Sequence, residues 1–308
     1  MEYKKIVLAG GNGYLGKVFT AYYKDKADSI IILSRKPQPQ IGNIKTLVWD
    51  GINEGEWGSE LNGAELLINL CGKNVNCRYT KANREEIITS RVVPTTLLGK
   101  VIQKLEHPPK LWINITSATI YRHAEDRPQD EETGEYGQGF SVEVCKQWEK
   151  FFFEANTPHT RKIALRMGIV LGMSDSAFPR LLNLVKWGLG GQQGNGQQYM
   201  SWVHEQDAAK CTEFLIDHEE LSGAINCSAP HPVKNNMLMG IIRKAFRMPF
   251  GLPAPAWLLT IGALIIGTET ELILKSRWVM PKRLLDAGYQ FLFANPDEAI
   301  NNLINKTT

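Results

Sequence analysis

The sequence is short of the features that mark secreted and metal-binding proteins. Its 308 residues include five cysteines, an odd number, and no two of them have Cys-x-x-Cys spacing. We therefore expect neither a disulfide framework nor a metal site, and reduced thiols in a cytoplasmic protein are the simpler interpretation. The first five residues lead directly into a strand-like run, which is not the pattern of a secretory signal peptide.

Long apolar runs and a strong excess of one charge are also missing. The most apolar stretch, Trp257 to Gly267, has about 11 residues, whereas a membrane-spanning helix needs about 20. We expect this stretch to form a buried helix or a docking surface and not a membrane span. The formal net charge is only +3, with Lys and Arg spread along the chain, so we expect no nucleic-acid partner.

Three common catalytic signatures are absent. The sequence contains no Gly-x-Ser-x-Gly, no His-Glu-x-x-His and no Walker A loop. These absences argue against an α/β-hydrolase, a zinc protease and a P-loop nucleotidase. What remains is an ordinary content of 43% hydrophobic and 22% charged residues in a chain long enough for a full core.

The first half of the chain alternates short apolar runs with helical segments. This alternation predicts a Rossmann-type, doubly wound parallel sheet. Pro94 would interrupt one of the helices, so we expect a kink or a break there. The predicted strands are residues 6–9, 30–33, 46–49, 66–70, 111–115 and 161–170, and the predicted helices are residues 14–24, 84–105 and 143–155.

The pattern changes after about residue 172. A Gly- and Gln-rich segment at residues 188–196 predicts a loop, residues 206–217 a helix and residues 224–227 a short strand. We therefore divide the chain into a Rossmann domain of residues 1–172 and a smaller mixed lobe of residues 173–308. The smaller lobe is expected to pack over the carboxyl edge of the sheet and to end in a helical segment.

A glycine loop follows the first predicted strand directly. Gly10 permits a tight turn, Gly13 lets the backbone approach a pyrophosphate, and Gly16 lets the next helix lie close to the strand. The free N–H groups at the start of that helix then face the phosphates. The loop predicts dinucleotide binding, with a plain strand–turn–helix as the alternative; its other residues expected at the cofactor are Asn12, Tyr14 and Leu15.

The end of the second strand indicates which dinucleotide is bound. An NAD site usually has an acidic residue there to hold the ribose 2′-hydroxyl, but this sequence has Ser34, Arg35 and Lys36. Arg35 can pair with a 2′-phosphate, Ser34 can donate a hydrogen bond and Lys36 adds positive charge. We favour NADP(H) over NAD(H), and the alternative is a solvated basic turn.

Two further segments follow predicted strands and belong to the expected cofactor site. Asp50 comes after the third strand, where an acid can meet the adenine. Leu70, Cys71 and Gly72 come after the fourth strand, where small residues let the backbone pass the cofactor. Both predictions depend on the parallel sheet.

Several segments together resemble one family. The chain resembles an atypical, extended short-chain dehydrogenase/reductase, and within it the group of nucleoside-diphosphate-sugar epimerases that carries its own short C-terminal domain. The resemblance implies an oxidoreductase or epimerase acting on a small polar substrate such as a nucleotide sugar. Besides the glycine loop it rests on Asn69 to Gly72, Arg78 to Thr80, Ser90-Arg91, Ser201 to Asp207 and Ser276 to Phe291.

The sequence departs from this family at the catalytic pair. Enzymes of the common type place Tyr-x-x-x-Lys on a helix, where the Tyr is the general acid/base and the Lys lowers its pKa. The corresponding positions here are Phe140 and Val144, which cannot do acid/base work. The one literal match, Tyr22 to Lys26, lies at the far end of the first helix and is treated as coincidence.

Candidate catalytic residues remain at the end of the fifth strand. Ser117 lies where the superfamily's catalytic Ser is expected, although a polar cap on a strand end is the alternative. Tyr121 and Lys146 are the nearest replacements for the missing pair, and we take Tyr121 forward with Ser117.

Other polar residues are candidate ligands with structural alternatives. Arg166 is expected at the cofactor or as an ion-pair partner. His204 is expected at the substrate pocket, or with Asp207 as a cap of the following helix. Arg78 is expected at the substrate pocket and Ser90 at the cofactor. Together with Arg91 they can hold an anionic group such as a diphosphate; the alternative is that they belong to a solvated helix face.

Three hypotheses for the function follow. The first is an NADP(H)-dependent oxidoreductase or epimerase-like enzyme, with Ser117 orienting the substrate oxygen and water or Tyr121 as the proton partner. The second is a non-catalytic NADP-binding sensor, which the missing Tyr and Lys favour. A structural protein using residues 257–267 as a contact surface is a third hypothesis.

Overall fold

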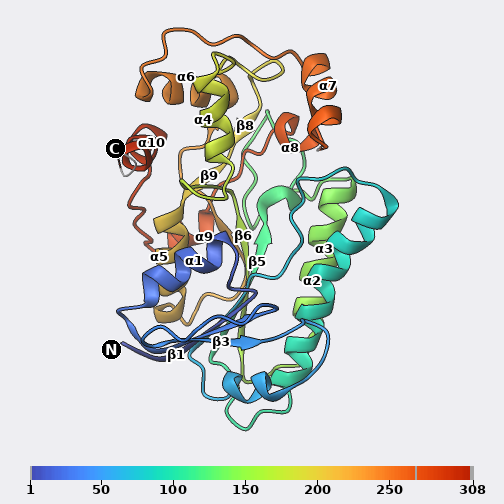
Figure 1. Ribbon diagram of the computed structural model, residues 1–308, viewed down its shortest axis with the longest axis vertical. Coiled ribbons are helices and arrows are strands. Elements are labelled where there is room, and N and C mark those ends of the chain that lie inside the picture. The colour runs from blue at the N-terminus through green and yellow to red at the C-terminus, as the bar shows by residue number, and fades with distance from the viewer. Residues whose placement is uncertain (1, 268, 306–308) are drawn as a thin grey trace.

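A seven-stranded parallel sheet forms the centre of the molecule in the computed structural model, which describes residues 2–267 and 269–305 (Figure 1). The strand order is β10-β6-β5-β4-β1-β2-β3, and all six pairings are parallel. The prediction of a doubly wound Rossmann-type sheet is confirmed. The strands are β1 Tyr3–Ala9, β2 Ala27–Ser34, β3 Ile44–Val48, β4 Leu66–Asn69, β5 Leu111–Ser117, β6 Arg161–Met167 and β10 Gly223–Cys227.

Helices cover both faces of this sheet. Phe19 and Tyr23 of α1 share one core with Cys211 and Leu215 of α5, and the α2 and α3 side chains share a second core on the other face. The sheet strands are apolar on both faces, as expected of buried parallel strands. The helices of this layer are α1 Tyr14–Tyr23, α2 Lys81–Ile102, α3 Phe140–Glu154 and α5 Glu205–Asp217.

Helix α2 passes through Pro94 without a break. Thr80 caps its first turn by accepting a hydrogen bond from the Asn83 N–H, and the helix then runs on to Ile102. Pro94 is buried, with Leu97 and Leu98 of the next turn packed in the core. Burial of this face holds the helix together although Pro94 removes one backbone donor, so the predicted break is wrong, while a kink at Pro94 stays a prediction.

The predicted sixth strand divides in two. β6 ends at Met167, and the chain continues as β7 Ile169–Leu171, which pairs with β9 Trp202–His204 away from the main sheet. Gly168 lies at the division, where a Cβ atom would stand 2.9 Å from the Ser201 carbonyl oxygen. The glycine therefore lets the two backbones meet as the chain leaves the sheet.

A smaller lobe rises from the carboxyl end of the sheet (Figure 1). Its core joins Phe178, Trp202, Leu238 and Ile300. β10 returns from this part of the chain to pair with β6, so residues 173–308 also complete the main sheet, and the division at residue 172 stays a prediction. The remaining elements are β8 Tyr199–Met200, β11 Val233–Lys234, α4 Phe178–Lys186, α6 Asn235–Ala245, α7 Ala256–Ile266, α8 Glu271–Leu274, α9 Lys282–Asp286 and α10 Pro296–Asn305.

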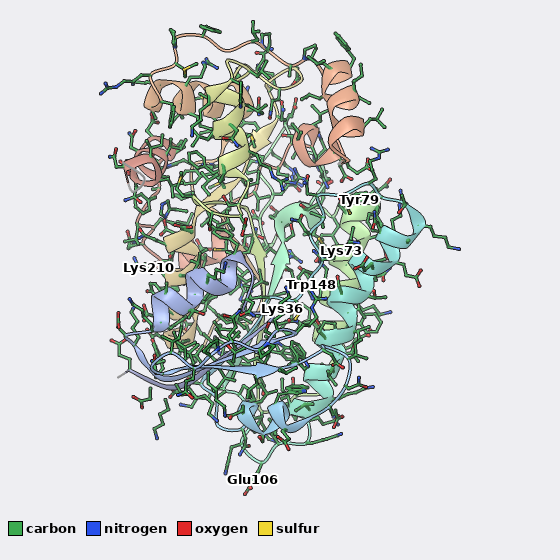
Figure 2. The ribbon with its side chains drawn as sticks, viewed as in Figure 1. Lys36, Lys73, Tyr79, Glu106, Trp148 and Lys210 are labelled. Carbon is green, nitrogen blue, oxygen red and sulfur yellow. The ribbon has the colours of Figure 1, made fainter. Side chains whose placement is uncertain are left out.

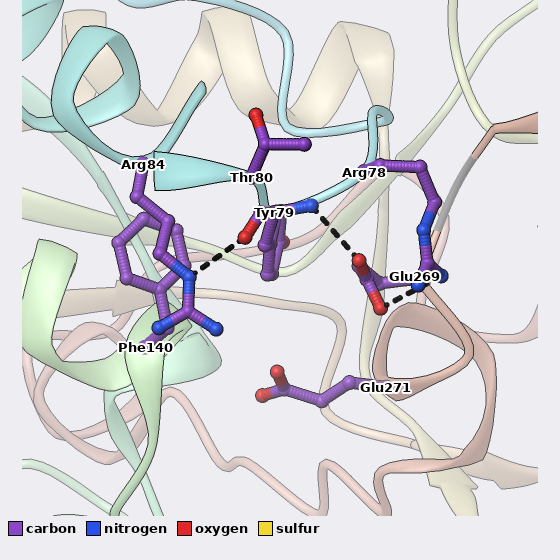
Figure 3. A pocket seen from close by; sticks show the side chains of 7 residues that line it. All are labelled: Arg78, Tyr79, Thr80, Arg84, Phe140, Glu269 and Glu271. Atoms are coloured by element: carbon purple, nitrogen blue, oxygen red, sulfur yellow. Dashed lines mark hydrogen bonds and ion pairs between the residues drawn. The ribbon is translucent and has the colours of Figure 1, made fainter. Parts of the chain in front are cut away.

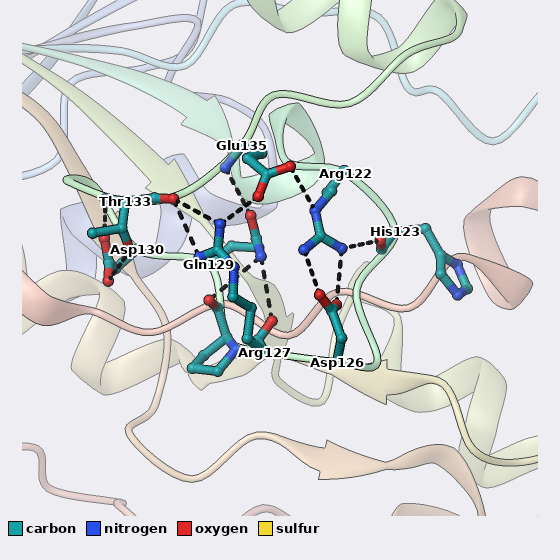
Figure 4. Close-up of polar contacts among 9 residues, drawn as sticks. Arg122, His123, Asp126, Arg127, Gln129, Asp130, Thr133 and Glu135 are labelled. Atoms are coloured by element: carbon teal, nitrogen blue, oxygen red, sulfur yellow. Dashed lines mark hydrogen bonds and ion pairs between the residues drawn. The ribbon is translucent and has the colours of Figure 1, made fainter.

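The loop between β5 and α3 ties the two parts together. After the short 3-10 helix η2, Ala118–Ile120, it is held by its own ion pairs, including Arg122 with Asp126 at 2.7 Å (Figure 4). Gln129 then exchanges backbone hydrogen bonds with Trp278 and Met280 at 2.7 and 2.9 Å. The C-terminal segment is thereby fixed beside the end of β5. Among the described residues, no helix is long and apolar enough to cross a bilayer.

Candidate functional site

The glycine loop makes a tight turn between β1 and α1, and its predicted contact with a pyrophosphate stays a prediction. Gly10 has a φ of +75°, and a Cβ atom there would meet the Cys71 Sγ at 3.0 Å. A Cβ on Gly16 would stand 1.9 Å from the Gly11 carbonyl oxygen, so only glycine lets α1 start this close to β1. Gly13 has no atom nearer than 4.0 Å to a built Cβ, which leaves the space above the loop open.

The start of α1 fits an anionic ligand. Gly13 is the N-cap residue and supplies no side-chain hydrogen bond, and the first turn carries no acidic residue. Its N–H groups therefore point toward the open space with the positive end of the helix dipole. Leu15 packs toward the core, and the Tyr14 hydroxyl donates to Glu205 at 2.6 Å, linking α1 to α5.

Polar and basic residues lie at the end of β2, beside the glycine loop. The Asn12 side-chain amide donates to the Ser34 hydroxyl, which also accepts from the Lys36 N–H at 3.3 Å. Ser34 is buried, whereas Arg35 and Lys36 are exposed. Figure 2 shows Lys36 on the side of the sheet that faces the smaller lobe, with Trp148, Lys73 and Tyr79 above it in this view. The predicted contact of Arg35 and Lys36 with a 2′-phosphate stays a prediction.

Asp50 makes its contacts within its own turn. Its carboxylate accepts from the Ile52 and Asn53 N–H groups at 2.8 and 2.9 Å and from the Asn53 side chain at 2.7 Å. These hydrogen bonds lower the pKa of the Asp50 carboxyl. The carboxylate is exposed and shapes the loop after β3; its predicted contact with adenine stays a prediction.

Hydrogen bonds of the Asn69 side chain hold the segment after β4 in place. The buried Asn69 side chain accepts from the Cys71 N–H at 3.1 Å and donates to Asn114 at 2.7 Å. Burial raises the pKa of the Cys71 thiol to about 12, although the Arg35 charge opposes the change. Leu70 packs against the core, so the backbone of Cys71 and Gly72 is what this segment offers a ligand.

Ser90 and Arg91 of α2 hold the continuation of this segment. The Ser90 hydroxyl accepts from the Lys73 N–H at 2.9 Å, and Arg91 donates to the Lys73 carbonyl at 3.1 Å. The Arg91 guanidinium also lies 5.1 Å from the centre of the Trp148 ring. Both residues therefore position the strand–loop junction, and a direct ligand contact by Ser90 stays a prediction.

Two adjoining cavities lie where the end of β5 meets the smaller lobe. The inner one, of about 120 Å³, contains Ser117, whose hydroxyl accepts from the Thr119 N–H at 3.2 Å. The outer one, of about 430 Å³, shares Tyr79 and Phe140 with it. Its lining is Arg78, Tyr79, Thr80, Arg84, Phe140, Glu269 and Glu271 (Figure 3).

Phe140 occupies the wall of both cavities where the family's Tyr is expected. Its ring packs edge-on against Tyr79 at 4.8 Å, and the Arg84 guanidinium lies 4.9 Å from its centre. Val144, at the position of the family's Lys, is buried and lines the inner cavity. No proton-transferring group stands at either position.

Charged groups from the C-terminal lobe complete the outer cavity. Glu269 accepts from the Tyr79 N–H at 2.9 Å and from Arg78 at 3.2 Å (Figure 3). Glu271 accepts from the Ser141 hydroxyl at 3.2 Å. Arg78 therefore lines the outer cavity and is paired with Glu269 there; its predicted contact with a substrate stays a prediction.

Lys275 lies behind the inner cavity. Its ammonium donates to the carbonyl of Thr119, a residue of the cavity wall, at 2.9 Å. Burial, with a smaller effect of the Arg277 charge, lowers the pKa of Lys275 to about 8. A lysine in this range can exchange a proton near neutral pH.

Arg166 and Tyr121 belong to a buried network. Arg166 makes two hydrogen bonds to Glu149, at 2.8 and 2.7 Å, and donates to the Tyr121 and Tyr136 hydroxyls at 2.8 Å each. Tyr121 in turn donates to Asn226 at 3.0 Å. The geometry favours the ion-pair alternative for Arg166, and Tyr121, only 2% exposed, is not among the residues that line either cavity.

His204 is fully buried and caps a helix. Its Nδ1 accepts from the Gln206 N–H at 3.1 Å at the start of α5, and its ring lies 4.0 Å from that of Phe293. Asp207 instead accepts from the N–H groups of Leu292 and Phe293 at 2.7 and 3.0 Å. The helix-cap alternative describes His204, while a substrate contact stays a prediction.

The structure adds residues to the site that sequence reasoning did not single out. Tyr79 stood inside a segment of the family resemblance, so a signal for it existed. Glu269, Glu271 and Lys275 are about 130 residues or more from Ser117 and Ser141 in the chain, and no local pattern marked them.

The comparisons with known proteins agree with this fold and loop. The family model "NAD dependent epimerase/dehydratase family" matches residues 6–228, and the "Domain of unknown function (DUF1731)" matches residues 254–303. The chain is 28% identical over 301 residues to the epimerase family protein YfhF of Bacillus subtilis (strain 168), covering 97% of each.

Two solved structures share the arrangement over nearly the whole chain. The human epimerase family protein SDR39U1 (isoform2), solved with NADPH, has a TM-score of 0.86 and 26% identity, covering 98% of this chain and 99% of that one. A nucleoside-diphosphate sugar epimerase from Corynebacterium glutamicum has a TM-score of 0.78 and 26% identity, covering 99% of this chain and 59% of that one. Since the first family model extends from β1 through β10 and matches more than half of the chain, this chain belongs to the NAD dependent epimerase/dehydratase family.

Proposed function

We propose that this protein binds NADP(H) in preference to NAD(H) and uses it for hydride transfer on a small polar substrate, with nucleotide sugars as the substrate class. The observation that carries the proposal is the pairing of Asn12 with Ser34, which sets Arg35 and Lys36 beside the glycine loop. A 2′-phosphate needs charge-assisted donors at this position. The human relative solved with NADPH supports the same choice.

The substrate is expected in the two cavities. Arg78 and Arg84 line the outer cavity, where a diphosphate can bind, and Ser117 lies in the inner cavity near the end of β5. Ligands of open parallel sheets bind beyond the carboxyl ends of the strands, which is where both cavities lie. The name of the Corynebacterium glutamicum relative supports a nucleotide sugar.

Residues of this chain take over the tasks of the missing pair. Bound NADPH supplies the hydride. Ser117 donates a hydrogen bond to the substrate oxygen, and the Tyr79 hydroxyl in the same cavity orients the substrate. Burial raises the pKa of Tyr79, so its hydroxyl stays neutral and does not act as a base. Because the Tyr79 proton is donated to Ser141, its oxygen is left to accept a hydrogen bond from the substrate. Water is the proton source, because Lys275, although its pKa is lowered to about 8, lies behind the wall of the inner cavity and donates to the Thr119 carbonyl.

An activity screen tests the proposal. Purified protein with NADPH is mixed with a panel of sugar nucleotides, aldehydes and ketones, and the absorbance of the reduced nicotinamide is followed. Turnover that is lost in Ser117→Ala and retained in the exposed control Ser59→Ala supports the enzyme. Tight NADPH binding without turnover on any substrate favours the second candidate, a non-catalytic NADP sensor. The presence of Phe140 and Val144 in place of the family's Tyr and Lys supports that candidate.

A further inference from the structure

The far end of the smaller lobe exposes large apolar side chains. Trp187 after α4 is 82% exposed and Trp257 in the first turn of α7 is 66% exposed. In Figure 1, α4 and α6 lie side by side at this end, and the chain crosses from α6 to α7 on the opposite side of the same end. We call it the distal face, and its exposed apolar residues are Trp187, Leu189, Phe250, Leu252, Trp257, Leu258, Ile261 and Leu264.

Backbone pairing makes the distal face continuous. The Leu252 N–H donates to the Gly188 carbonyl at 2.8 Å, and the Ala254 N–H donates to the Gln192 carbonyl at 2.9 Å. These bonds run the segment before α7 alongside the segment after α4. A Cβ on Gly188 would also meet the Phe250 ring at 3.2 Å. Trp187 and Leu189 therefore lie beside Phe250 and Leu252, and the exposed residues of α7 follow directly in the chain.

The chain segments that form the distal face carry basic residues and lack acidic ones. Residues 176–204 and 221–268 contain no Asp or Glu, whereas they contain six Lys and Arg residues. The basic residues are Arg180, Lys186, Lys234, Arg243, Lys244 and Arg247; of these, Arg180, Lys186, Lys244 and Arg247 are exposed.

Acidic groups of the adjoining elements do not cancel this charge. Glu269 and Glu271, next to α7, bond to Arg78 and Ser141 at the outer cavity. Asp297 and Glu298 stand at the start of α10, which Figure 1 shows below α6 and away from α7. The distal face thus combines exposed Trp, Phe and Leu side chains with positively charged ones.

We propose that the distal face docks on the surface of a bilayer that contains anionic phospholipids. Exposed aromatic and aliphatic side chains insert at the headgroup boundary, and Lys and Arg pair with the anionic headgroups. Helix α7 is too short to span a membrane, and with Trp257, Leu258, Ile261 and Leu264 exposed it suits a helix lying in the plane of the surface. The proposal does not depend on the cofactor or the substrate.

A second copy of the chain is the less suitable occupant. A two-fold dimer would set the same basic residues against each other across its interface, since such an interface uses one patch twice. Like charges brought together in this way oppose association, whereas an anionic surface neutralises them. Charge complementarity therefore favours the bilayer.

Vesicle co-sedimentation tests the docking. The full chain is mixed with vesicles of phosphatidylcholine alone or of phosphatidylcholine with about one third phosphatidylglycerol, at low and at physiological salt. We expect binding to the anionic vesicles that weakens as salt rises, and at least tenfold weaker binding to the neutral ones. Absence of binding to anionic vesicles at low salt overturns the proposal.

Paired variants locate the contact. Lys186→Glu with Lys244→Glu should weaken vesicle binding by at least roughly 25-fold, since each basic residue contributes roughly fivefold near an anionic surface and each new carboxylate is repelled by it. Lys4→Glu with Lys100→Glu makes the same change in net charge elsewhere and should leave binding within about a few-fold of the wild type. Leu264→Glu should abolish insertion, while Ile52→Glu, equally exposed beyond β3, should not.

Two results count against the bilayer. Equal losses in the distal and control charge variants would show a non-specific effect of net charge. A wild-type dimer in solution that Leu264→Glu converts to a monomer, together with unchanged vesicle binding in that variant, would assign the face to a second copy. NADPH affinity, measured in parallel, reports whether each variant is folded.

Discussion

The Tyr79 hydroxyl lies 3.3 Å from the Ser141 hydroxyl, and because Ser141 donates to Glu271 at 3.2 Å, Tyr79 is the donor of the pair. This chain of hydrogen bonds joins the loop before α2, the first turn of α3 and helix α8 of the smaller lobe. It holds the Tyr79 ring against Phe140, the residue that replaces the family's catalytic Tyr. A hydroxyl is thus restored near the lost position from a different part of the chain.

If this hydroxyl orients the substrate, its removal should lower turnover without unfolding the protein. Tyr79→Phe keeps the ring contact with Phe140 and should reduce kcat/KM by roughly tenfold, the value of about one hydrogen bond. Ser117→Ala should reduce kcat by roughly a hundredfold or more, as expected for a donor at a developing negative charge. Steady-state rates with NADPH and an active substrate measure both.

The control for this pair is Tyr136→Phe, because that hydroxyl accepts from Arg166 away from the two cavities. It should leave turnover nearly unchanged. Equal losses in Tyr79→Phe and Tyr136→Phe would remove the assignment of Tyr79 to substrate binding.

Lys275 should give stability a distinctive dependence on pH. Its pKa is about 8 in the folded protein and 10.5 in its ordinary state, so between these values the unfolded chain binds more protons than the folded one. The free energy of unfolding should therefore rise with pH in this window because of Lys275. Urea unfolding from about pH 7.5 to 9.5 should show a flatter profile in Lys275→Met than in the wild type. A difference in the free energy of unfolding between the two proteins that stays constant across that pH range would contradict the lowered pKa of Lys275.

Arg35 is expected to discriminate between the two cofactors. Arg35→Asp should weaken NADPH by roughly 10- to 100-fold, since charge-assisted hydrogen bonds contribute about 1.5–3 kcal/mol, and should change NADH affinity much less. Fluorescence titration with each cofactor measures the ratio. Lys81→Asp, an equal charge change at the start of α2, serves as the control. Equal weakening of NADPH and NADH by Arg35→Asp would remove the NADP(H) assignment.

Two glycines of the same loop should respond in opposite ways to an added methyl group. Gly16→Ala places a Cβ 1.9 Å from the Gly11 carbonyl and should destabilise or unfold the protein. Gly13→Ala has room and an ordinary φ of −75°, so it should fold normally but bind NADPH at least tenfold more weakly because the methyl group keeps the pyrophosphate away. Thermal unfolding and cofactor titration separate the two effects. Normal NADPH affinity in a folded Gly13→Ala would show that the phosphates lie elsewhere.

The sheet and the cofactor loop were predictable from the sequence because their signals are local. A buried strand followed by Gly10, Gly13 and Gly16 occupies ten to fifteen consecutive residues. The outer cavity was not predictable, because Tyr79, Ser141 and Glu271 meet only after the chain has crossed the sheet and returned. For Arg166 the sequence allowed either a ligand contact or an ion pair. Only the structure, which places the buried Glu149 carboxylate beside it, favours the ion pair.

Arg166 should therefore matter more for stability than for cofactor binding. Arg166→Met removes one partner of a buried pair and leaves the Glu149 carboxylate uncompensated, which typically costs about 3–5 kcal/mol. The double variant Arg166→Met with Glu149→Gln removes that lone charge and should recover part of the loss. Arg122→Met, at an exposed ion pair with Asp126, should cost no more than about 1 kcal/mol. Urea unfolding measures the stabilities and NADPH titration of the folded variants measures binding. A large loss of NADPH affinity in a stable Arg166→Met protein would return Arg166 to the cofactor site, because an ion pair that only holds β6 against α3 does not reach the ligand.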